Sequence, residues 1–417
     1  MDLTYTEMPA LNRIQAASIL NRMGETGQPP EYGLEFITVG IEPYLHIVEH
    51  EYLGRLIKRA KGSAFRLVQG SYGCGKTHFL YCVRSLAQRL GFLTCTVNLS
   101  PKECPYEDTV KVYKAIFDNL ACKLPEEYLE EGSGCYKDTV YGFSDILRLF
   151  ARGELKTENP APSFSEVSVE NYAFRTACCE FVKACREGRA DDEELLEYWL
   201  SGETQTTGEG LRRLGIFESI SYDNAFPAMR SLISIVLAMG FPGVVFLFDE
   251  VDLHTSGTSK KHMRAMGDNL RRLIDLCASS AMPGVMFFYA VPPEFLNFDI
   301  TVYPALQQRL MTPLAMSKSS PQSVVIDLEK ISVESREFLY ALGERLIMIS
   351  ARAWDWNPHK SEIMADNLRR FVDFAEEHVF TGGYRLFVKF WIAVLFEQYG
   401  GGIKPLSEES FAELLQL

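Results

Sequence analysis

The sequence predicts an α/β protein with a parallel sheet that carries helices on both faces. Two stretches of the chain alternate apolar, strand-like runs with amphipathic, helix-like segments, and a long region of mainly helical pattern separates them. Such alternation is typical of parallel sheets covered by helices. Only helical patterns follow residue 330. We therefore expect a sheet-containing core, a large helical insertion within it and a helical C-terminal region.

The first alternating stretch surrounds a glycine-rich loop. Its elements are an amphipathic helix over 41–60, the strand FRLVQ at 65–69, the loop itself, a helix over 76–90 and the strand FLTCTVNLS at 92–100. Residues 101–240 then show mainly helical periodicity. Clusters of turn-forming and polar residues mark expected loops at 127–134, 157–166 and 201–210.

The second alternating stretch repeats the pattern of strand and helix. Strands are expected at VVFLFDE (244–250), GVMFFYA (284–290) and SVVIDLE (323–329), with helices over 260–280 and around ALQQRL (305–310). The helical pattern after residue 330 has breaks at DWNP and FTGGY. The predicted domains are an N-terminal segment (1–40), a core (41–330) that contains the insertion (101–230), and a C-terminal helical domain (331–417).

Composition and charge restrict the classes of function. The 417 residues are 47% hydrophobic, which suffices for a folded core, and their net charge is −13. This charge argues against a chain that binds nucleic acid over its whole surface. Between Lys102 and Arg230 there are 25 acidic and 15 basic residues, so this region carries −10 of the −13. Because its carboxylates should repel DNA, we expect the acidic insertion either to contact a protein partner, for which a basic surface would suit, or to face outward.

The cysteines and the longest apolar run indicate a cytosolic protein. The ten cysteines include no C-x-x-C pair, and the N-terminus shows no signal segment, so we expect reduced, buried thiols. The uncharged run at 231–248 has nearly the length of a membrane span, but Gly240, Pro242 and Gly243 interrupt it. It predicts a buried helix, a turn and a buried strand.

The glycine-rich loop GSYGCGKTHFL (70–80) carries the most specific chemical signal. Gly70, Gly75, Lys76 and Thr77 satisfy G-x-x-x-x-G-K-[ST], the Walker A pattern of phosphate-binding loops. Such a loop wraps backbone N–H groups around a phosphate chain at a helix N-terminus. The lysine meets the β- and γ-phosphates, and the threonine is a ligand of Mg²⁺. The residues expected to bind the nucleotide are Gly70, Ser71, Tyr72, Gly73, Cys74, Gly75, Lys76, Thr77 and His78.

An acidic pair follows the apolar run at 244–248. The strand would deliver Asp249 and Glu250 to the carboxyl edge of the sheet, where ligands bind in open α/β proteins. In this Walker B role, Asp249 would hold Mg²⁺ and Glu250 would polarise the attacking water. Alone, the pair would suit a helix N-terminus equally well. Beside the phosphate-binding loop it predicts hydrolysis of Mg-ATP, because that chemistry needs both motifs.

Two arginines are further candidates for catalysis. Arg309 in YPALQQRL would reach the γ-phosphate bound to an adjoining subunit, or it is an ordinary surface arginine. Arg385 in FTGGYRLFVKF begins an apolar helix. It either faces the nucleotide and couples the C-terminal helices to hydrolysis, or its stem covers apolar surface while its charge reaches water.

Two other patterns have simpler interpretations. The basic stretch SKKHMR (259–264) fits contacts with DNA phosphates, but a solvated loop or helix start explains it more simply. HIVEH (46–50) matches the H-x-x-E-H spacing of some zinc metalloproteases. It lies in the helix that leads to the phosphate-binding loop and has no peptidase domain around it. We interpret it as a partly exposed helix face.

The ordered motifs resemble one family. GSYGCGKTHFL, VVFLFDEVD, NLRRLID (269–275), MFFYAVPPEF (286–295) and YPALQQRL (303–310) resemble the ATP-binding BrxD proteins of bacteriophage-exclusion (BREX) defence systems. These proteins look like AAA+ ATPases related to the origin-recognition and STAND branches, and the resemblance covers most of the chain. It implies an AAA+ P-loop core with a helical lid over 331–417 and ATP hydrolysis by a multimer. It also implies that Arg309 acts in trans as an arginine finger and Arg385 as the second sensor.

The chain departs from the AAA+ pattern at the end of the strand at 284–290. AAA+ proteins usually place a polar first sensor there, whereas this chain has Ala290, Val291, Pro292 and Pro293. None of these side chains forms hydrogen bonds. Either Tyr289 or the backbone substitutes, or turnover is slow. A C-terminal winged-helix signature is also not evident, so direct binding of DNA rests on analogy.

Two functions follow from these patterns. In the first, an energy-transducing ATPase that uses ATP and Mg²⁺ acts in bacterial anti-phage defence, on DNA or with a DNA-processing partner such as a helicase or methyltransferase. In the second, a nucleotide-controlled switch holds ATP with little turnover and serves as a scaffold or sensor. For both, we expect a cytoplasmic homo-oligomer without a membrane segment.

Overall fold

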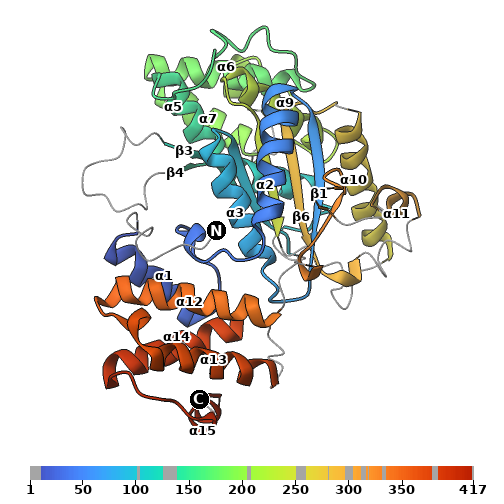
Figure 1. Cartoon of the computed structure of the whole chain (residues 1–417). Helices are drawn as coiled ribbons and strands as arrows, with labels where there is room; N and C mark the ends of the chain where they lie inside the picture. Colours follow the sequence, from blue (N-terminus) through green and yellow to red (C-terminus); the bar gives the residue numbers. More distant parts are fainter. Residues whose placement is uncertain are drawn as a thin grey trace. The chain divides into compact units, whose positions relative to one another are not determined.

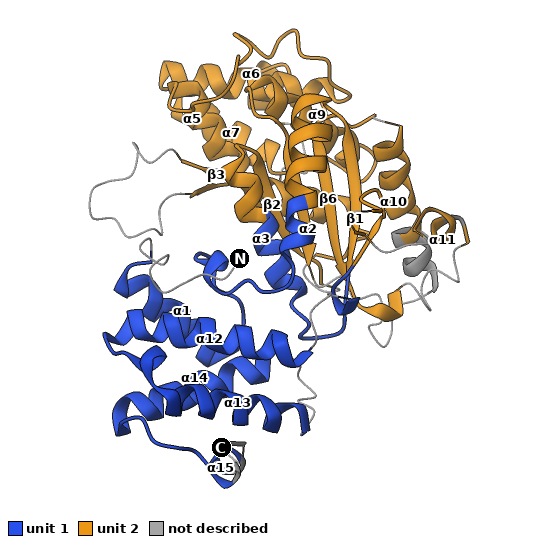
Figure 2. Ribbon diagram, in the orientation of Figure 1, with its two compact units in different colours: residues 1–46, 69–83, 327–417 blue, residues 47–68, 84–326 orange. Residues whose placement is uncertain are grey.

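The computed structural model describes residues 11–100, 104–124, 139–203, 208–249, 260–279, 281–295, 304–310, 316–317, 319–330, 335–377 and 384–415. The chain forms two compact units (Figure 2). Unit 1 comprises residues 1–46, 69–83 and 327–417, and unit 2 comprises residues 47–68 and 84–326. Each unit has its own apolar core. The predicted domain boundaries stay a prediction beside this division.

Unit 2 is built on a mostly parallel sheet in the order β4-β3-β2-β5-β6-β1-β7 (Figure 1). The strands are β1 (Ser63–Gln69), β2 (Leu93–Asn98), β3 (Leu120–Lys123), β4 (Thr139–Tyr141), β5 (Val244–Asp249), β6 (Val285–Val291) and β7 (Val325–Asp327). In the parallel centre, Cys95 of β2 aligns with Phe246 of β5, which aligns with Phe287 of β6. Only β6 lies between β5, which ends at Asp249, and β1, the strand before the glycine-rich loop.

The strands at the centre of the sheet confirm the alternating pattern of the sequence, and those at one edge correct it. The segments 244–249 and 285–291 are buried along their whole length, as fully covered parallel strands are. The region from 101 to 240 is not only helical, because β3 pairs antiparallel with β2 and β4 pairs antiparallel with β3. They are four and three residues long, too short to show an alternating pattern in the sequence.

Helices cover the sheet of unit 2 (Figure 1). They are η3 (Val48–Arg59), α4 (Thr109–Asn119), α5 (Phe143–Arg152), α6 (Tyr172–Glu187), α7 (Ala190–Leu200), α8 (Glu209–Arg213), α9 (Ala225–Ala238), α10 (Lys260–Ala278) and α11 (Pro304–Leu310). The helix α3 (Lys76–Arg89) begins in unit 1 and ends in unit 2. The predicted helix at 41–60 consists of α2 (Glu42–Ile47) and η3, a π-helix.

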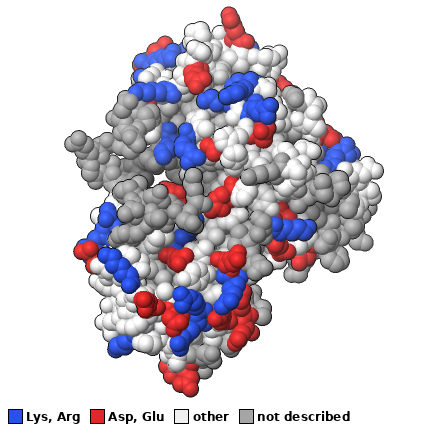
Figure 3. Space-filling model, in the orientation of Figure 1, with Lys and Arg blue, Asp and Glu red and all other residues white. Residues whose placement is uncertain are grey.

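The acidic insertion neutralises part of its own charge. Arg148 of α5 forms ion pairs with Asp145 at 2.6 Å, with Glu193 at 2.5 Å and with Glu197. Asp192 pairs with two further arginines of the insertion. Figure 3 accordingly shows basic and acidic side chains interspersed on the visible face. The expected contact of the insertion with a basic partner stays a prediction.

Unit 1 has its own apolar core and is built from helices. They are α1 (Arg13–Thr26), η2 (Leu34–Phe36), α2, η7 (Leu328–Lys330), α12 (Ser335–Trp354), η8 (Pro358–Lys360), α13 (Glu362–Glu377), α14 (Tyr384–Gly401) and α15 (Glu408–Leu415). The N-terminal helix α1 packs against α12 and α14. Trp391 of α14 is fully buried and stacks on Phe371 of α13, with the ring centres 5.3 Å apart. The sequence patterns after residue 330 therefore correctly predict helices.

The apolar run at 231–248 matches its prediction, and the prediction of buried thiols holds for most of the described cysteines. The nine cysteines among the described residues are free, and six of them are buried. The run forms the end of α9, a turn at 239–243 and the buried strand β5. No helix in the described ranges combines the length and the apolar composition needed to span a membrane.

Candidate functional site

The glycine-rich loop links β1 to α3, as the sequence predicts. The chain leaves β1 at Gln69, and α3 begins at Lys76. Gly73 and Gly75 have φ angles of 83° and 98°, in the left-handed region that other residues rarely adopt. The first turn of α3 closes with a hydrogen bond from Phe79 N to the carbonyl oxygen of Gly75 at 2.9 Å. The loop therefore ends at a helix N-terminus, where backbone N–H groups attract anions.

The amine of Lys76 is folded back onto the loop. Its Nζ donates hydrogen bonds to the carbonyl oxygens of Gly70 at 2.6 Å and Ser71 at 2.9 Å. These carbonyls satisfy two of the three donors of the ammonium group. Thr77 follows in the first turn of α3 and is half-buried.

A carboxylate that the sequence analysis missed holds the start of the loop. Glu329 Oε1 accepts a hydrogen bond from Ser71 N at 2.8 Å and a second one from the hydroxyl of Ser71. Glu329 lies in η7, directly after β7. Its place at the carboxyl end of the predicted strand 323–329 was the available signal. Burial raises the pKa of the nearby Tyr384, and Cys74 and Glu329 add to the effect.

His78 lies half-buried in unit 1, against the segment that precedes α2. Thr38 donates its hydroxyl proton to the carbonyl oxygen of Leu34 at 2.7 Å, so the Nε2–H of His78 donates to Thr38 at 3.0 Å. Burial, with Arg345 as a smaller cause, lowers the pKa of His78 to about 4. The imidazole is therefore neutral and serves as a packing and hydrogen-bonding group; its contact with a nucleotide stays a prediction.

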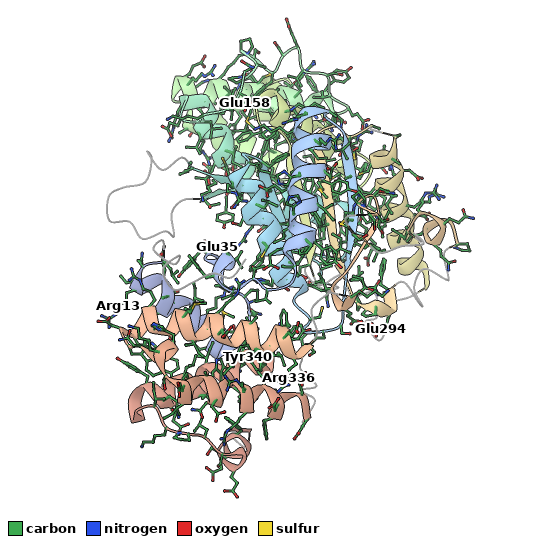
Figure 4. All side chains as sticks on the ribbon, viewed as in Figure 1. Arg13, Glu35, Glu158, Glu294, Arg336 and Tyr340 are labelled. Carbon is green, nitrogen blue, oxygen red and sulfur yellow. The ribbon has the colours of Figure 1, made fainter. Side chains whose placement is uncertain are left out.

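Arg345 of α12 joins the same N-terminal segment to the C-terminal helices. It donates from Nη1 to the carbonyl oxygen of Glu35 at 3.1 Å, and its Nη2 lies 3.7 Å from the carboxylate of Glu42. Figure 4 labels Glu35 on this segment. These contacts join residues more than 300 positions apart, so no local sequence pattern could reveal them.

Arg385 contacts the loop itself. It lies in the first turn of α14, as the sequence predicts, and its Nη1 donates to the hydroxyl of Tyr72 at 2.8 Å. Its guanidinium carbon lies 5.1 Å from the centre of the Tyr72 ring. Arg385 and the loop belong to the same unit. The structure thus brings the predicted second sensor to the predicted phosphate-binding loop.

Asp249 belongs to unit 2, at the end of β5. It is 5% exposed and pairs in register with Asn98 of the parallel strand β2. Its carbonyl oxygen accepts a hydrogen bond from Leu99 N at 3.0 Å. Glu250, the predicted base, lies outside the described residues. The structure confirms the apolar strand before Asp249, and the joint action of Asp249 with the loop stays a prediction.

The end of β6 carries one hydroxyl, and that hydroxyl already has a partner. Tyr289 is 1% exposed, and its hydroxyl lies 2.9 Å from the hydroxyl of Tyr106. The Tyr289 ring stacks on the ring of Phe248, the residue before Asp249, with the ring centres 4.5 Å apart. Burial raises the pKa of both tyrosines. Tyr289 is therefore engaged with a neighbouring side chain at the position where a first sensor is expected.

Arg309 lies in α11 and pairs with α10. Its Nε and Nη2 donate to the two carboxylate oxygens of Asp275, at 2.5 and 3.0 Å. Asp275 is the last residue of the segment NLRRLID, but no local sequence pattern pairs it with Arg309. The bidentate contact fixes the plane of the guanidinium group. This contact is compatible with both interpretations of Arg309 from the sequence, an arginine finger and an ordinary surface arginine.

The two remaining sequence patterns fall mainly on helices. The carboxylate of Glu49, in HIVEH, pairs with Arg89 at 3.4 Å, and within the described ranges no cluster of three His, Cys, Asp or Glu residues could hold a metal ion. In SKKHMR, residues 260–264 begin α10, and Ser259 lies outside the described residues.

Comparison with protein families assigns the chain to a family. The profile of one family, described as BREX system ATP-binding protein BrxC/D, matches residues 12–130 and 156–395. The matched residues include the glycine-rich loop, Asp249, Arg309 and Arg385. No individual curated protein matches the chain at a significant level.

Proposed function

The chain belongs to the BREX system ATP-binding protein BrxC/D family, and from this premise we propose that it hydrolyses Mg-ATP through an AAA+ core and couples hydrolysis to anti-phage defence. ATP binding and a role in BREX defence come with the family. The observation that carries the proposal is the strand, glycine turn and helix that lead from β1 through Gly75 to Lys76. The parallel α/β sheet is compatible with a P-loop NTPase core.

The loop residues fit a triphosphate. Gly73 and Gly75 give the backbone its left-handed turn, and α3 begins directly behind them. Lys76 would exchange the carbonyl oxygens of Gly70 and Ser71 for phosphate oxygens, which make stronger, charge-assisted hydrogen bonds. The loop therefore supplies both the cation and the helix N-terminus that a phosphate chain requires.

Oxygen donors are present for a divalent cation. The hydroxyl of Thr77 and the carboxylate of Asp249 are ligands of the kind that Mg²⁺ prefers, and we propose that they hold it together. When bound, Mg²⁺ would neutralise charge on the phosphates. Glu250 would orient and polarise the attacking water, as a general base must.

The two arginines give hydrolysis a mechanical output in this proposal. Arg309 would complete the site of an adjoining subunit in trans, which makes turnover depend on a homo-oligomer. Arg385 would connect the terminal phosphate to α14 and so to the lid helices of unit 1. DNA, or a helicase-like or methyltransferase partner in the cytoplasm, would receive the resulting conformational change.

A second function has its own supporting observation. The side chains at the end of β6 are apolar except for Tyr289, whose hydroxyl is bonded to Tyr106. A site without a polar first sensor would turn over slowly. In that case the protein is a nucleotide-controlled switch or scaffold that signals by holding ATP rather than by hydrolysing it.

A phosphate-release assay separates the two functions. We would compare the wild type, Glu250→Gln and Lys76→Ala, each without DNA, with single-stranded DNA and with double-stranded DNA. Hydrolysis predicts multiple-turnover release that Glu250→Gln abolishes while ATP binding persists. No release by the wild type under any condition would support the switch. Equal nucleotide titration curves for Lys76→Ala and the wild type would refute the nucleotide site itself.

The oligomeric state is a separate test of the role of Arg309. Electron microscopy of the full chain with a non-hydrolysable ATP analogue would show whether subunits place Arg309 beside a neighbour's loop. A monomer under these conditions would exclude a finger in trans.

A further inference from the structure

Arg385 is held on the outer side of the phosphate-binding loop. Tyr72, the loop residue that holds it, is 74% exposed, so its ring extends into solvent. The guanidinium group lies over this ring and donates to the hydroxyl at the far end of it. The contact combines a cation–π interaction with a charged hydrogen bond. To touch a phosphate bound by the loop backbone, Arg385 would have to leave the tip of Tyr72.

The path of the arginine side chain is shaped for this contact. Gly27, at the end of α1, has a φ angle of 65° and carries no side chain. A Cβ added there would lie 2.1 Å from the Cγ of Arg385, closer than any pair of non-bonded atoms approaches. The stem of Arg385 therefore lies directly on the backbone of Gly27. This close packing restricts the rotamers of Arg385 in the state that contacts Tyr72.

In this state, both cations that are assigned to the phosphates already form hydrogen bonds with the loop. Lys76 donates to the carbonyl oxygens of Gly70 and Ser71, and Arg385 donates to Tyr72. A nucleotide must therefore compete with contacts that the loop already makes. The competition differs between the cations, because the lysine belongs to the loop and the arginine belongs to the lid helix α14.

We propose that Tyr72 is a specificity-determining residue that holds Arg385 off the phosphate site until a nucleotide with a γ-phosphate displaces it. The proposal rests on the proposed ATP site and on Arg385 as its second sensor. ATP offers the arginine a charged oxygen in exchange for Tyr72. ADP offers no such exchange, so Arg385 stays on Tyr72. The lid arginine thus responds to the terminal phosphate rather than to nucleotide in general.

The proposal has a quantitative consequence for binding. A contact that exists only in the nucleotide-free and ADP-bound states reduces the apparent affinity for ATP and leaves the affinity for ADP unchanged. Removing Tyr72 should therefore tighten ATP binding. For an exposed cation–π contact with one hydrogen bond, the gain should be about threefold to tenfold. Tyr72→Phe keeps the ring and loses the hydroxyl, so its gain should be about twofold to threefold.

The experiment is a double-mutant cycle on the full-length chain. Tyr72→Ala, Arg385→Ala and the double variant are titrated with Mg-ADP and with a non-hydrolysable Mg-ATP analogue. Tyr172→Ala is the matched control, because Tyr172 is 67% exposed and has Arg175 at 5.1 Å over its ring, in α6 of unit 2. ADP affinity reports whether the loop is intact in each variant.

Three results would support the inference together. Tyr72→Ala keeps the backbone N–H that the loop would offer to a phosphate, so it binds the ATP analogue more tightly and ADP with unchanged affinity. Arg385→Ala binds the ATP analogue more weakly, and the double variant equals Arg385→Ala. Weaker or unchanged binding of the analogue by Tyr72→Ala would overturn it. So would a gain that persists without Arg385, because Tyr72 would then act alone. Unaltered binding by Lys76→Ala would instead refute the nucleotide site, which is a different failure.

Discussion

The carboxylate of Glu329 accepts hydrogen bonds from both the backbone amide and the hydroxyl of Ser71. This contact joins the turn after β7 to the second residue of the phosphate-binding loop. Asp327 supports the turn, since its Oδ1 accepts a hydrogen bond from Glu329 N at 3.1 Å. The shape of the loop therefore depends on a segment more than 250 residues further along the chain.

Glu329→Ala should weaken nucleotide binding. The variant removes the acceptor for two donors of Ser71, which leaves the start of the loop less ordered. Because the contact is exposed to solvent, we expect a cost of about 1 kcal/mol, or about fivefold in affinity for both ATP and ADP. Fluorescence titration measures the effect, and Glu337→Ala, at an exposed carboxylate of α12, is the control. Wild-type affinity in Glu329→Ala would contradict the role of the contact.

His78 should make the folded state sensitive to acid. Its pKa falls from an ordinary 6.5 to about 4 on folding because the imidazole is buried. The unfolded chain therefore binds a proton that the folded chain does not, and stability is lost as the pH falls from 6.5 towards 4. We expect a loss of about 2 kcal/mol between pH 7.5 and pH 5 from this group.

Urea unfolding of two variants tests this expectation. His78→Gln retains a side-chain N–H for Thr38 and has no titrating group, so its free energy of unfolding should fall less between pH 7.5 and pH 5. His359→Gln, at a half-buried histidine near the end of α12, should keep most of the wild-type slope. A slope for His78→Gln equal to that of the wild type would show that His78 does not carry the effect.

Asp275 should support turnover if Arg309 is a finger. Arg309→Ala would lower phosphate release by about 10³-fold to 10⁵-fold, the range known for arginine fingers. Asp275→Asn leaves the arginine in place but weakens the bidentate contact that orients it, so a loss of about threefold to tenfold is expected. Nucleotide affinity should stay constant in both variants. Wild-type release by Arg309→Ala would identify an ordinary surface arginine.

Removal of the paired hydroxyls of Tyr106 and Tyr289 should change the free energy of unfolding non-additively. Tyr106→Phe or Tyr289→Phe alone leaves a buried hydroxyl without its partner, at a cost of about 1–3 kcal/mol. The double variant removes both hydroxyls and should cost less than the sum of the single variants. Urea unfolding of the four proteins measures this difference. Additive losses would mean that the two hydroxyls find other partners.

The sequence predicts best the features that depend on neighbouring residues. The strand β5, the loop around Gly75 and the helix beginning at Lys76 follow from apolar runs, glycine spacing and a motif within a few positions of one another. The short edge strands β3 and β4 were missed, because three or four residues carry no periodicity and their pairing depends on β2. Local pattern therefore suffices for the sheet centre and fails at its edge.

The contacts of the candidate site were less predictable than its motif. Glu329 on Ser71, Thr38 on His78 and Asp275 on Arg309 each join segments that are distant in sequence, and polar residues at such positions look like ordinary surface residues. The position of Arg385 in the first turn of its helix was predictable from the preceding glycines. Its partner Tyr72 was predictable only as a member of the loop motif.

The packing of α1 against α12 and α14 has a consequence for biosynthesis. During synthesis, α1 leaves the ribosome before α12 and α14 have been made, so it finds these partners late. The strands of unit 2 are complete before that point. Nascent chains that stop near residue 330 should therefore protect the sheet against proteolysis while leaving the N-terminal helix open to cleavage.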